Sequence, residues 1–255
     1  MKYDLRVRDS CGNLVEVLQE LPDKGDKFPT ILMVPGFGMD LHEYGYFDEV
    51  SDVLVKNGFQ TFRFSFAGTG KSERDFISMT VDKQVQQLTD LLKYVKNDRF
   101  TNKRKIGILA QSFGTVIVRR ALPIPGIKTI VFTATPPDPY TSLEKWFKRQ
   151  RGFFPDGISQ IQRADKRITK IGPQFWQNLG TYNFVREIQK LTQPLLLIHG
   201  GNDDRIRKWK VEEYFNHIPG VKRLQIIEKS DHAFNGKFRP QVLKLIADWF
   251  DETLR

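Results

Sequence analysis

The stretch that decides the fold is Ile106-Gly-Ile-Leu-Ala-Gln-Ser-Phe-Gly-Thr-Val-Ile-Val118. Its first residues predict a short strand covered on both faces, and the residues from Phe113 onward have the pattern of an amphipathic helix. The turn between them is centred on Ser112, with small residues two positions before it (Ala110) and two positions after it (Gly114). Small residues are needed there because strand and helix approach closely. The sequence predicts a strained turn that exposes a serine hydroxyl, and the alternative is a buried serine in an ordinary turn.

Further short apolar runs surround this stretch, and helical patterns separate them. Strands are expected at Thr30–Val34, Thr61–Phe66, Thr129–Thr133 and Leu195–Ile198. Apolar residues at helical spacing occur over Phe47–Lys56 and Val81–Val95. Alternating strands and helices predict an α/β fold with a mostly parallel sheet, helices on both faces, and ligands beyond the carboxyl ends of the strands. Tyr3–Arg8 and Leu14–Leu21 alternate in polarity around a turn, which predicts an antiparallel N-terminal hairpin at the sheet edge.

The segment from Pro136 to about Lys190 breaks this alternation, because it is far longer than a crossover needs to be. It contains several helical patterns, so we expect a single domain over residues 1–255 with a helical cap inserted at about 136–190. Residues 141–190 hold ten Lys or Arg and four Asp or Glu. Six of the ten excess positive charges of the chain therefore lie in the predicted cap.

Composition excludes several classes of protein. The chain has 255 residues and one cysteine, so an intrachain disulfide framework and a cysteine-built zinc or iron–sulfur site are ruled out. No apolar run approaches the length of about eighteen residues that spans a bilayer, and we expect a soluble, cytoplasmic protein. The net charge of +10 is compatible with nucleic acid, an anionic surface or an acidic substrate. No nucleic-acid-binding motif is visible, so a nucleic-acid partner is not expected, whereas transient contact with an anionic surface stays open.

Two later segments supply an acid and a histidine, each after a predicted strand. Leu195–Ile206 reads as a buried strand that ends in a Gly-rich turn, and Asp203 lies in this turn. Asp204 competes with it, but the Gly-x-x-Asp spacing from Gly200 selects Asp203. His232 follows the strand that begins near Arg223. Because parallel strands end at one edge of a sheet, these side chains can meet Ser112 there.

The order serine, acid, histidine, each on a loop after a later strand, resembles the α/β-hydrolase-fold serine hydrolases. The turn at Ser112 resembles their nucleophile elbow, with Ala110 where glycine is commoner. Within the fold, the chain is most similar to the carboxylesterases that include feruloyl (cinnamoyl) esterases and monoacylglycerol lipases. The resemblance implies a catalytic triad in which Ser112 is the nucleophile, His232 the general base and Asp203 the residue that orients the imidazole.

An enzyme of this kind needs two backbone N–H donors for the oxyanion. The resemblance implies Phe113, the residue after the nucleophile, and Phe37 in the loop Pro35-Gly36-Phe37-Gly38-Met39. Gly36 is expected to border the substrate. Pro35 stands where the family usually has histidine, which removes a side chain that often braces this loop.

The predicted cap is expected to shape the substrate pocket. We expect its aromatic residues to help line an apolar cleft, namely Trp146, Phe147, Phe153, Phe154, Phe175 and Trp176. The alternative is that half or more of them pack the cap helices together, as aromatic residues at helical spacing usually do. Basic residues such as Lys145, Lys148 and Arg149 should favour substrates that carry negative charge.

The predicted function is hydrolysis of a small-molecule carboxylic ester through an acyl-enzyme on Ser112. A thioesterase or amidase of the same fold and a catalytically silent ligand-binding protein are the alternatives. No metal or cofactor is implied. Nucleotide binding is not expected, because Gly68-Thr-Gly70-Lys-Ser72 lacks the first glycine of a phosphate-binding loop. The sequence does not define an oligomeric state.

Overall fold

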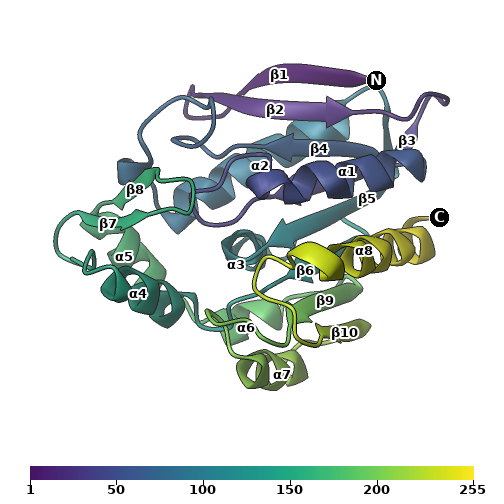
Figure 1. Cartoon of the computed structure of the whole chain (residues 1–255). Coiled ribbons are helices and arrows are strands. Elements are labelled where there is room, and N and C mark those ends of the chain that lie inside the picture. Colours follow the sequence, from purple (N-terminus) through teal and green to yellow (C-terminus); the bar gives the residue numbers. More distant parts are fainter.

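The central sheet of the computed structural model, which describes all residues from 1 to 255, has eight strands in the order β1-β2-β4-β3-β5-β6-β9-β10 (Figure 1). Its strands are β1 Lys2–Arg8, β2 Leu14–Glu20, β3 Phe28–Val34, β4 Gln60–Phe64, β5 Thr101–Gln111, β6 Thr129–Thr133, β9 Leu195–Gly200 and β10 Lys222–Ile227. The six strands from β4 to β10 in this order pair in parallel, and β1 and β2 form the antiparallel edge. The predicted α/β fold with its N-terminal hairpin is confirmed.

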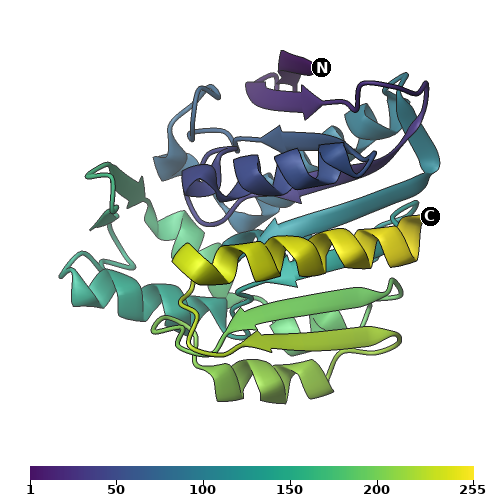
Figure 2. The ribbon, with the colours of Figure 1, turned by 45° about the vertical axis from the view of Figure 1, so that its right-hand side comes forward.

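Helices cover both faces of the sheet because successive strand residues point to opposite sides. Ile31 and Met33 of β3 pack under α1 (Tyr46–Lys56) and α8 (Arg239–Leu254), which lie in front of the sheet in Figure 2. Leu32 and Val34 face the opposite, larger core. That core is covered by α2 (Val81–Asn97), α3 (Phe113–Ala121) and α7 (Lys208–Asn216). None of the helices combines the length and the apolar character needed to cross a membrane.

We call the chain between β6 and β9 the β6–β9 segment (136–190). Most of it lies beyond the carboxyl ends of the strands, whereas its last helix packs against α3 (Figure 1). It contains α4 Pro139–Arg149, β7 Ser159–Gln162, β8 Ile168–Ile171, α5 Pro173–Gly180 and α6 Phe184–Ile188. Three helices lie in the predicted helical insertion, and the β7–β8 antiparallel hairpin is an addition that the sequence analysis did not predict. In β7 the side chains alternate, with Ile161 buried and Gln160 exposed. This period of two is typical of a strand, and it is too short to stand out in a highly charged stretch.

Three short 3-10 helices complete the structure: Glu43–Gly45, Phe76–Ser78 and Gly236–Phe238. The first follows the loop after β3 and directly precedes α1. It therefore places the side chain of Glu43 at the same sheet edge as the turn after β5.

Candidate active site

Ser112 lies in the turn between β5 and α3, where its backbone has φ 50° and ψ −117°. A non-glycine residue with positive φ is strained, and such strain is typical of functional turns. The Ser112 N–H donates to the carbonyl of Thr133 at 2.8 Å, which fixes the turn to the neighbouring strand. A Cβ atom at Gly114 would lie 2.4 Å from the carbonyl oxygen of Val34, so only glycine fits there. The predicted strained turn is present, and Ala110 is fully buried in the strand before it.

The structure brings the three predicted side chains together in one hydrogen-bonded chain. His232 follows β10, and its Nε2 lies 3.0 Å from Ser112 Oγ. Its Nδ1 lies 2.7 Å from an oxygen of Asp203, which follows β9. The other Asp203 oxygen accepts from the backbone N–H groups of Arg205 and Ile206, both at 2.9 Å. Asp204, the competing acid, points away from this chain, with 76% of its side chain exposed and Arg149 at 3.8 Å.

The electrostatics favour an ionised carboxylate beside the imidazole. Burial by itself would raise the pKa of Asp203, but the hydrogen bond with His232 and the charges of His232 and His199 lower it below the usual value. A carboxylate cannot donate a hydrogen bond, so the proton between the two groups belongs to Nδ1 of His232. Nε2 is then free to accept the hydroxyl proton of Ser112.

The loop after β3 is held by two charged side chains that the sequence did not single out. Glu43 accepts a hydrogen bond from the N–H of Gly36 at 2.8 Å. Arg163, from the turn of the β7–β8 hairpin, donates to the carbonyl of Phe37. The N–H of Phe37 lies between these two anchors, and neither it nor the N–H of Phe113 donates a hydrogen bond within the protein. Glu43 and Arg163 thus take the bracing role left open by Pro35.

Burial shifts the pKa values of both Glu43 and Arg163. It raises the pKa of Glu43 to about 7, against the opposing effects of the Gly36 N–H and the charge of Arg163. It lowers the pKa of Arg163 to about 10, which leaves the guanidinium charged at neutral pH. Only the position of Glu43 shortly after the glycine loop could have indicated its role. Nothing in the sequence separates Arg163 from the other basic residues of its segment.

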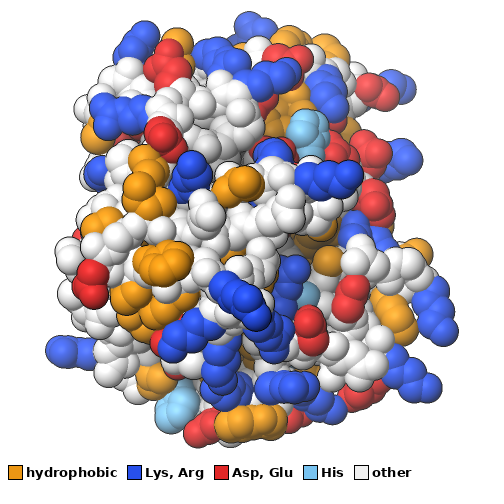
Figure 3. All heavy atoms as spheres, turned by 60° about the vertical axis from the view of Figure 1, so that its left-hand side comes forward, with side chains coloured by type: hydrophobic (Ala, Val, Ile, Leu, Met, Phe, Trp, Pro, Cys, Tyr) orange, Lys and Arg blue, Asp and Glu red, His pale blue; other side chains and the backbone are white.

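A cleft of about 300 Å³ opens above Ser112, and it is more polar than the sequence predicted. Besides Ser112, its charged or polar lining residues are Glu43, Tyr44, Tyr46, Gln111, Arg163, Arg205, His232, Asn235 and Arg239. Gly36, Phe37 and Trp146 also border it. Figure 3 shows this side of the molecule, where Lys and Arg side chains gather beside a hollow. A second, mainly apolar pocket of about 40 Å³ adjoins Ser112 and is lined by Phe37, Phe113, Pro136, Pro139, Leu143, Trp146 and Ile206, among others.

Most of the aromatic residues expected in the cleft pack elsewhere. Phe147, Phe175 and Trp176 are buried, and the rings of Phe147 and Phe175 lie 5.9 and 5.5 Å from the ring of Phe37. Phe153 packs against Trp176, with ring centroids 4.9 Å apart.

Phe154 is 54% exposed and touches neither pocket. Trp146 alone among the six lines the cleft. The expectation for the other five is wrong, because Phe154 is at the surface and the remaining four rings pack against Phe37 or against one another.

Comparisons with known proteins agree with this architecture. Est1E from Butyrivibrio proteoclasticus, in a structure with ferulic acid bound, superposes with a TM-score of 0.80 at 19% identity over 96% of this chain and 98% of that chain. The α/β hydrolase GrgF from Penicillium sp. sh18 gives a TM-score of 0.81 at 15% identity, over 100% and 99% of the two chains. The Pyrococcus furiosus esterase Pf2001 gives 0.75 at 19% identity, over 100% and 92%. Identities this low show the fold alone.

The molecule has the α/β-hydrolase fold, as the sequence predicted. A family model matches residues 46–255, and the chain therefore belongs to the prolyl oligopeptidase family. No curated protein matches its sequence.

Proposed function

We propose that this chain is a serine carboxylesterase that hydrolyses a small-molecule ester through an acyl-enzyme on Ser112. The observation that carries the proposal is the hydrogen-bonded chain from Ser112 Oγ through His232 to Asp203, with separations of 3.0 and 2.7 Å. These are the distances over which an imidazole can take the proton of an attacking hydroxyl. The β6–β9 segment acts as a cap over the site of a single-domain enzyme.

The reaction begins when Ser112 Oγ attacks the ester carbonyl and His232 Nε2 accepts its proton. Asp203 stabilises the imidazolium that forms and keeps the ring in the required orientation. His232 then returns the proton to the leaving alcohol, and the acyl group stays on Ser112. Water, activated by the same imidazole, attacks the acyl-enzyme, and the carboxylic acid leaves.

The developing oxyanion is bound by the N–H groups of Phe37 and Phe113. Both residues border the small pocket next to Ser112, and both amides are free of partners in the protein. Phe113 is the first residue of α3, so its N–H is one of those that a helix leaves unpaired. Two such preorganised donors stabilise a tetrahedral intermediate more than bulk water does.

Hydrolysis of an amide is the second candidate, because the matching family is that of the prolyl oligopeptidases. The ester is preferred because Est1E and Pf2001, which share the fold over nearly their whole length, are described as esterases or bind ferulic acid. The same acyl-enzyme chemistry would also accept a thioester.

The test has two parts. A fluorophosphonate probe should label the wild-type protein and leave Ser112→Ala unlabelled. The second part compares kcat/KM for the O-(4-nitrophenyl) ester, the S-(4-nitrophenyl) thioester and the 4-nitroanilide of butyric acid, which differ only at the scissile bond. We expect the ester to be the best substrate. Faster turnover of the anilide would favour the amidase, and absence of both labelling and turnover would favour a silent binding protein.

A further inference from the structure

The cleft above Ser112 contains a guanidinium group without any partner in the protein. Arg205 lies two residues after Asp203 and borders both the large cleft and the small pocket. Its side chain forms no hydrogen bond and no ion pair; the guanidinium carbon lies 4.9 Å from the centre of the Trp146 ring. An arginine stacked on an aromatic ring is held in place while its N–H groups stay available.

A second guanidinium approaches the same tryptophan. Arg163 lies 5.1 Å from the centre of the Trp146 ring, and its side chain is buried. It donates to Thr169 Oγ1 at 2.9 Å and to the carbonyl of Phe37, and it lies 3.5 Å from the sulfur of Met39. None of these partners is charged, so Arg163 is a buried cation without an ion-pair partner.

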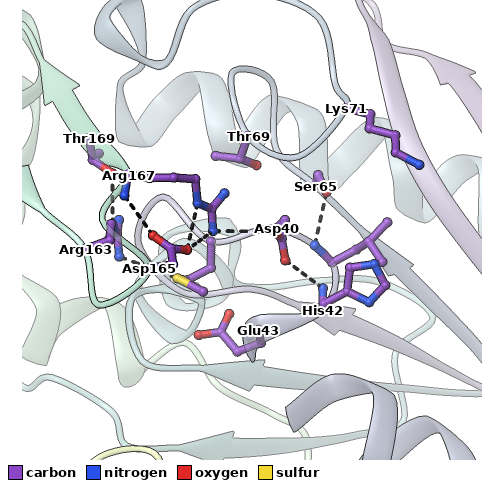
Figure 4. Close-up of polar contacts among 12 residues, drawn as sticks. Asp40, His42, Glu43, Ser65, Thr69, Lys71, Arg163, Asp165, Arg167 and Thr169 are labelled. Carbon is purple, nitrogen blue, oxygen red and sulfur yellow. Dashed lines mark hydrogen bonds and ion pairs between the residues drawn. The ribbon is translucent and has the colours of Figure 1, made fainter. Parts of the chain in front are cut away.

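Arg167, on the same hairpin turn, differs from Arg163 because it forms ion pairs. Arg167 pairs with Asp165 at 2.7 Å and with Asp40 at 3.6 Å, whereas Arg163 bonds the hydroxyl of Thr169 (Figure 4). Carboxylates are thus close to the turn, yet none pairs with the guanidinium that faces the cleft. A buried cation is costly unless it is paired, and an anionic ligand supplies the missing partner.

The other charged groups of the cleft do not neutralise the positive charges of Arg163 and Arg205. Arg239 is engaged by Glu49 at 3.2 Å and by the carbonyls of Ala233 and Phe234. Glu43 is the only carboxylate among the lining residues, and it is held by the N–H of Gly36. Burial raises its pKa to about 7, so a large part of it is neutral near pH 7. The cleft therefore carries an excess of positive charge beside Ser112.

We propose that the cleft selects esters that carry a negatively charged group, a carboxylate above all, on the acyl or the alcohol side of the scissile bond. Arg205 is the main contact and Arg163 the second, with Trp146 between them. The inference rests on the proposed esterase function and names its substrate class. Planar guanidinium groups suit a carboxylate because they offer paired N–H donors.

This inference changes the residues expected to favour negative charge. Lys148 pairs with Glu144 at 2.7 Å and Arg149 lies 3.8 Å from Asp204. Neither of them borders the cleft, and Lys145 does not either. Charge selection comes instead from two arginines within the site. Arg149 provides a matched control, because it is an arginine of the same face that already has a carboxylate nearby.

The experiment uses two pairs of esters, each matched in length. Mono-4-nitrophenyl adipate and its methyl ester place a charged or neutral group on the acyl side. 3-Carboxyphenyl butyrate and its methyl ester do the same on the alcohol side. For each pair, the ratio of kcat/KM for the charged ester to that for the neutral ester is measured after correction for enzyme-free hydrolysis. The proteins are the wild type, Arg205→Gln, Arg205→Glu and Arg149→Gln.

We expect the wild-type ratio to exceed one in at least one pair and to fall about tenfold in Arg205→Gln, the loss typical of one charged hydrogen bond. Arg205→Glu should lower it further, and Arg149→Gln should keep the wild-type ratio. High salt should reduce the preference. A wild-type ratio of one or less in both pairs, or a ratio unchanged in Arg205→Gln, would overturn the inference.

A binding measurement keeps the two proposals separate. Titration of Ser112→Ala with monomethyl adipate and with dimethyl adipate, followed by calorimetry, measures charge preference without turnover. Tighter binding of the charged ligand that disappears on adding Arg205→Gln supports the charge-selective site even if esterase activity is absent. Turnover of neutral esters without any charge preference in binding or kinetics supports the esterase and contradicts the anion site.

Discussion

The two halves of the site are held in different ways. The nucleophile turn is fixed by main-chain features: the hydrogen bond from Ser112 to Thr133 and the close approach of Gly114 to Val34. The loop that carries Phe37 is held by the side chains of Glu43 and Arg163, which come from other elements. The sheet therefore preorganises one half of the site. The other half depends on charged side chains that a substitution or a change of pH can release.

The largest effect is expected at the nucleophile itself. Ser112→Ala should lower kcat/KM for 4-nitrophenyl butyrate by at least about 10³-fold, because the residual activity of such sites comes from binding and the oxyanion donors alone. The thermal midpoint should stay near that of the wild type, since the backbone turn does not use the hydroxyl. Wild-type turnover by the folded variant would show that another residue attacks the ester.

The next effect separates the two neighbouring acids. Asp203→Asn should lower kcat by about 10³- to 10⁴-fold, because an amide no longer stabilises the imidazolium and permits the wrong tautomer. Asp204→Asn should stay within about twofold, since its side chain is exposed. Steady-state kinetics on both variants decide the assignment, and a larger loss in Asp204→Asn would reverse it.

A methyl group added at Gly114 tests the nucleophile turn, the half of the site that main-chain contacts hold. Gly114→Ala should destabilise the protein by about 3 kcal/mol, because the added Cβ would overlap two main-chain carbonyls that cannot move independently. Gly157→Ala is the control, with its nearest atom 3.9 Å away. Urea unfolding measures both. Equal stability of the two variants would mean that the turn is more pliable than its geometry indicates.

A change of pH tests the loop that carries Phe37, because the carboxyl group of Glu43 holds this loop. Its folded-state pKa of about 7 lies above the ordinary value of 4.5. The neutral carboxyl therefore contributes stability that is fully present below pH 4.5 and is lost as the pH rises through 7. Relative to Glu43→Gln, the wild type should lose about 2 kcal/mol between pH 5 and pH 8. Unfolding curves with the same pH dependence in both proteins would contradict the raised pKa.

The smallest effect is expected at Arg163, the second side chain that holds the loop after β3. Arg163→Met should lower kcat for a neutral ester about tenfold and change KM less, because the loop serves the transition state more than the ground state. Arg167→Met, on the same turn, should change kcat little because its partners are Asp165 and Asp40. A loss confined to KM would assign Arg163 to substrate binding alone.

The centre of the sheet was predictable because β3, β6 and β9 are short, mainly apolar and almost wholly buried. β6 has the predicted bounds, Thr129–Thr133. β5 begins at Thr101, before the expected Ile106; its first residues are mostly polar and exposed or half-buried, so the apolar pattern did not indicate them. The positions of Asp203 and His232 near Ser112 could be predicted as well, because each of these two residues follows a recognisable strand.

The β6–β9 segment could not be predicted in the same way. Helical spacing shows that Phe147 and Trp176 are buried, but it does not show whether a cleft or a core surrounds them. The roles of Arg163 and Arg205 depend on which carboxylates lie nearby in space, and no local pattern encodes that distance. Only the three-dimensional structure shows which charged residues, distant in sequence, form ion pairs and which have no partner.

The hairpin contact with Phe37 has a consequence for protein engineering. Exchanging the β6–β9 segment for that of a relative is an obvious route to a new substrate range. Such a chimera would also lose the hydrogen bond from Arg163 to the loop after β3, and its turnover would fall along with its old selectivity. The same segment thus affects both substrate range and turnover. A grafted segment should therefore carry an arginine at the hairpin turn, or the loop after β3 should be redesigned so that it no longer needs this hydrogen bond.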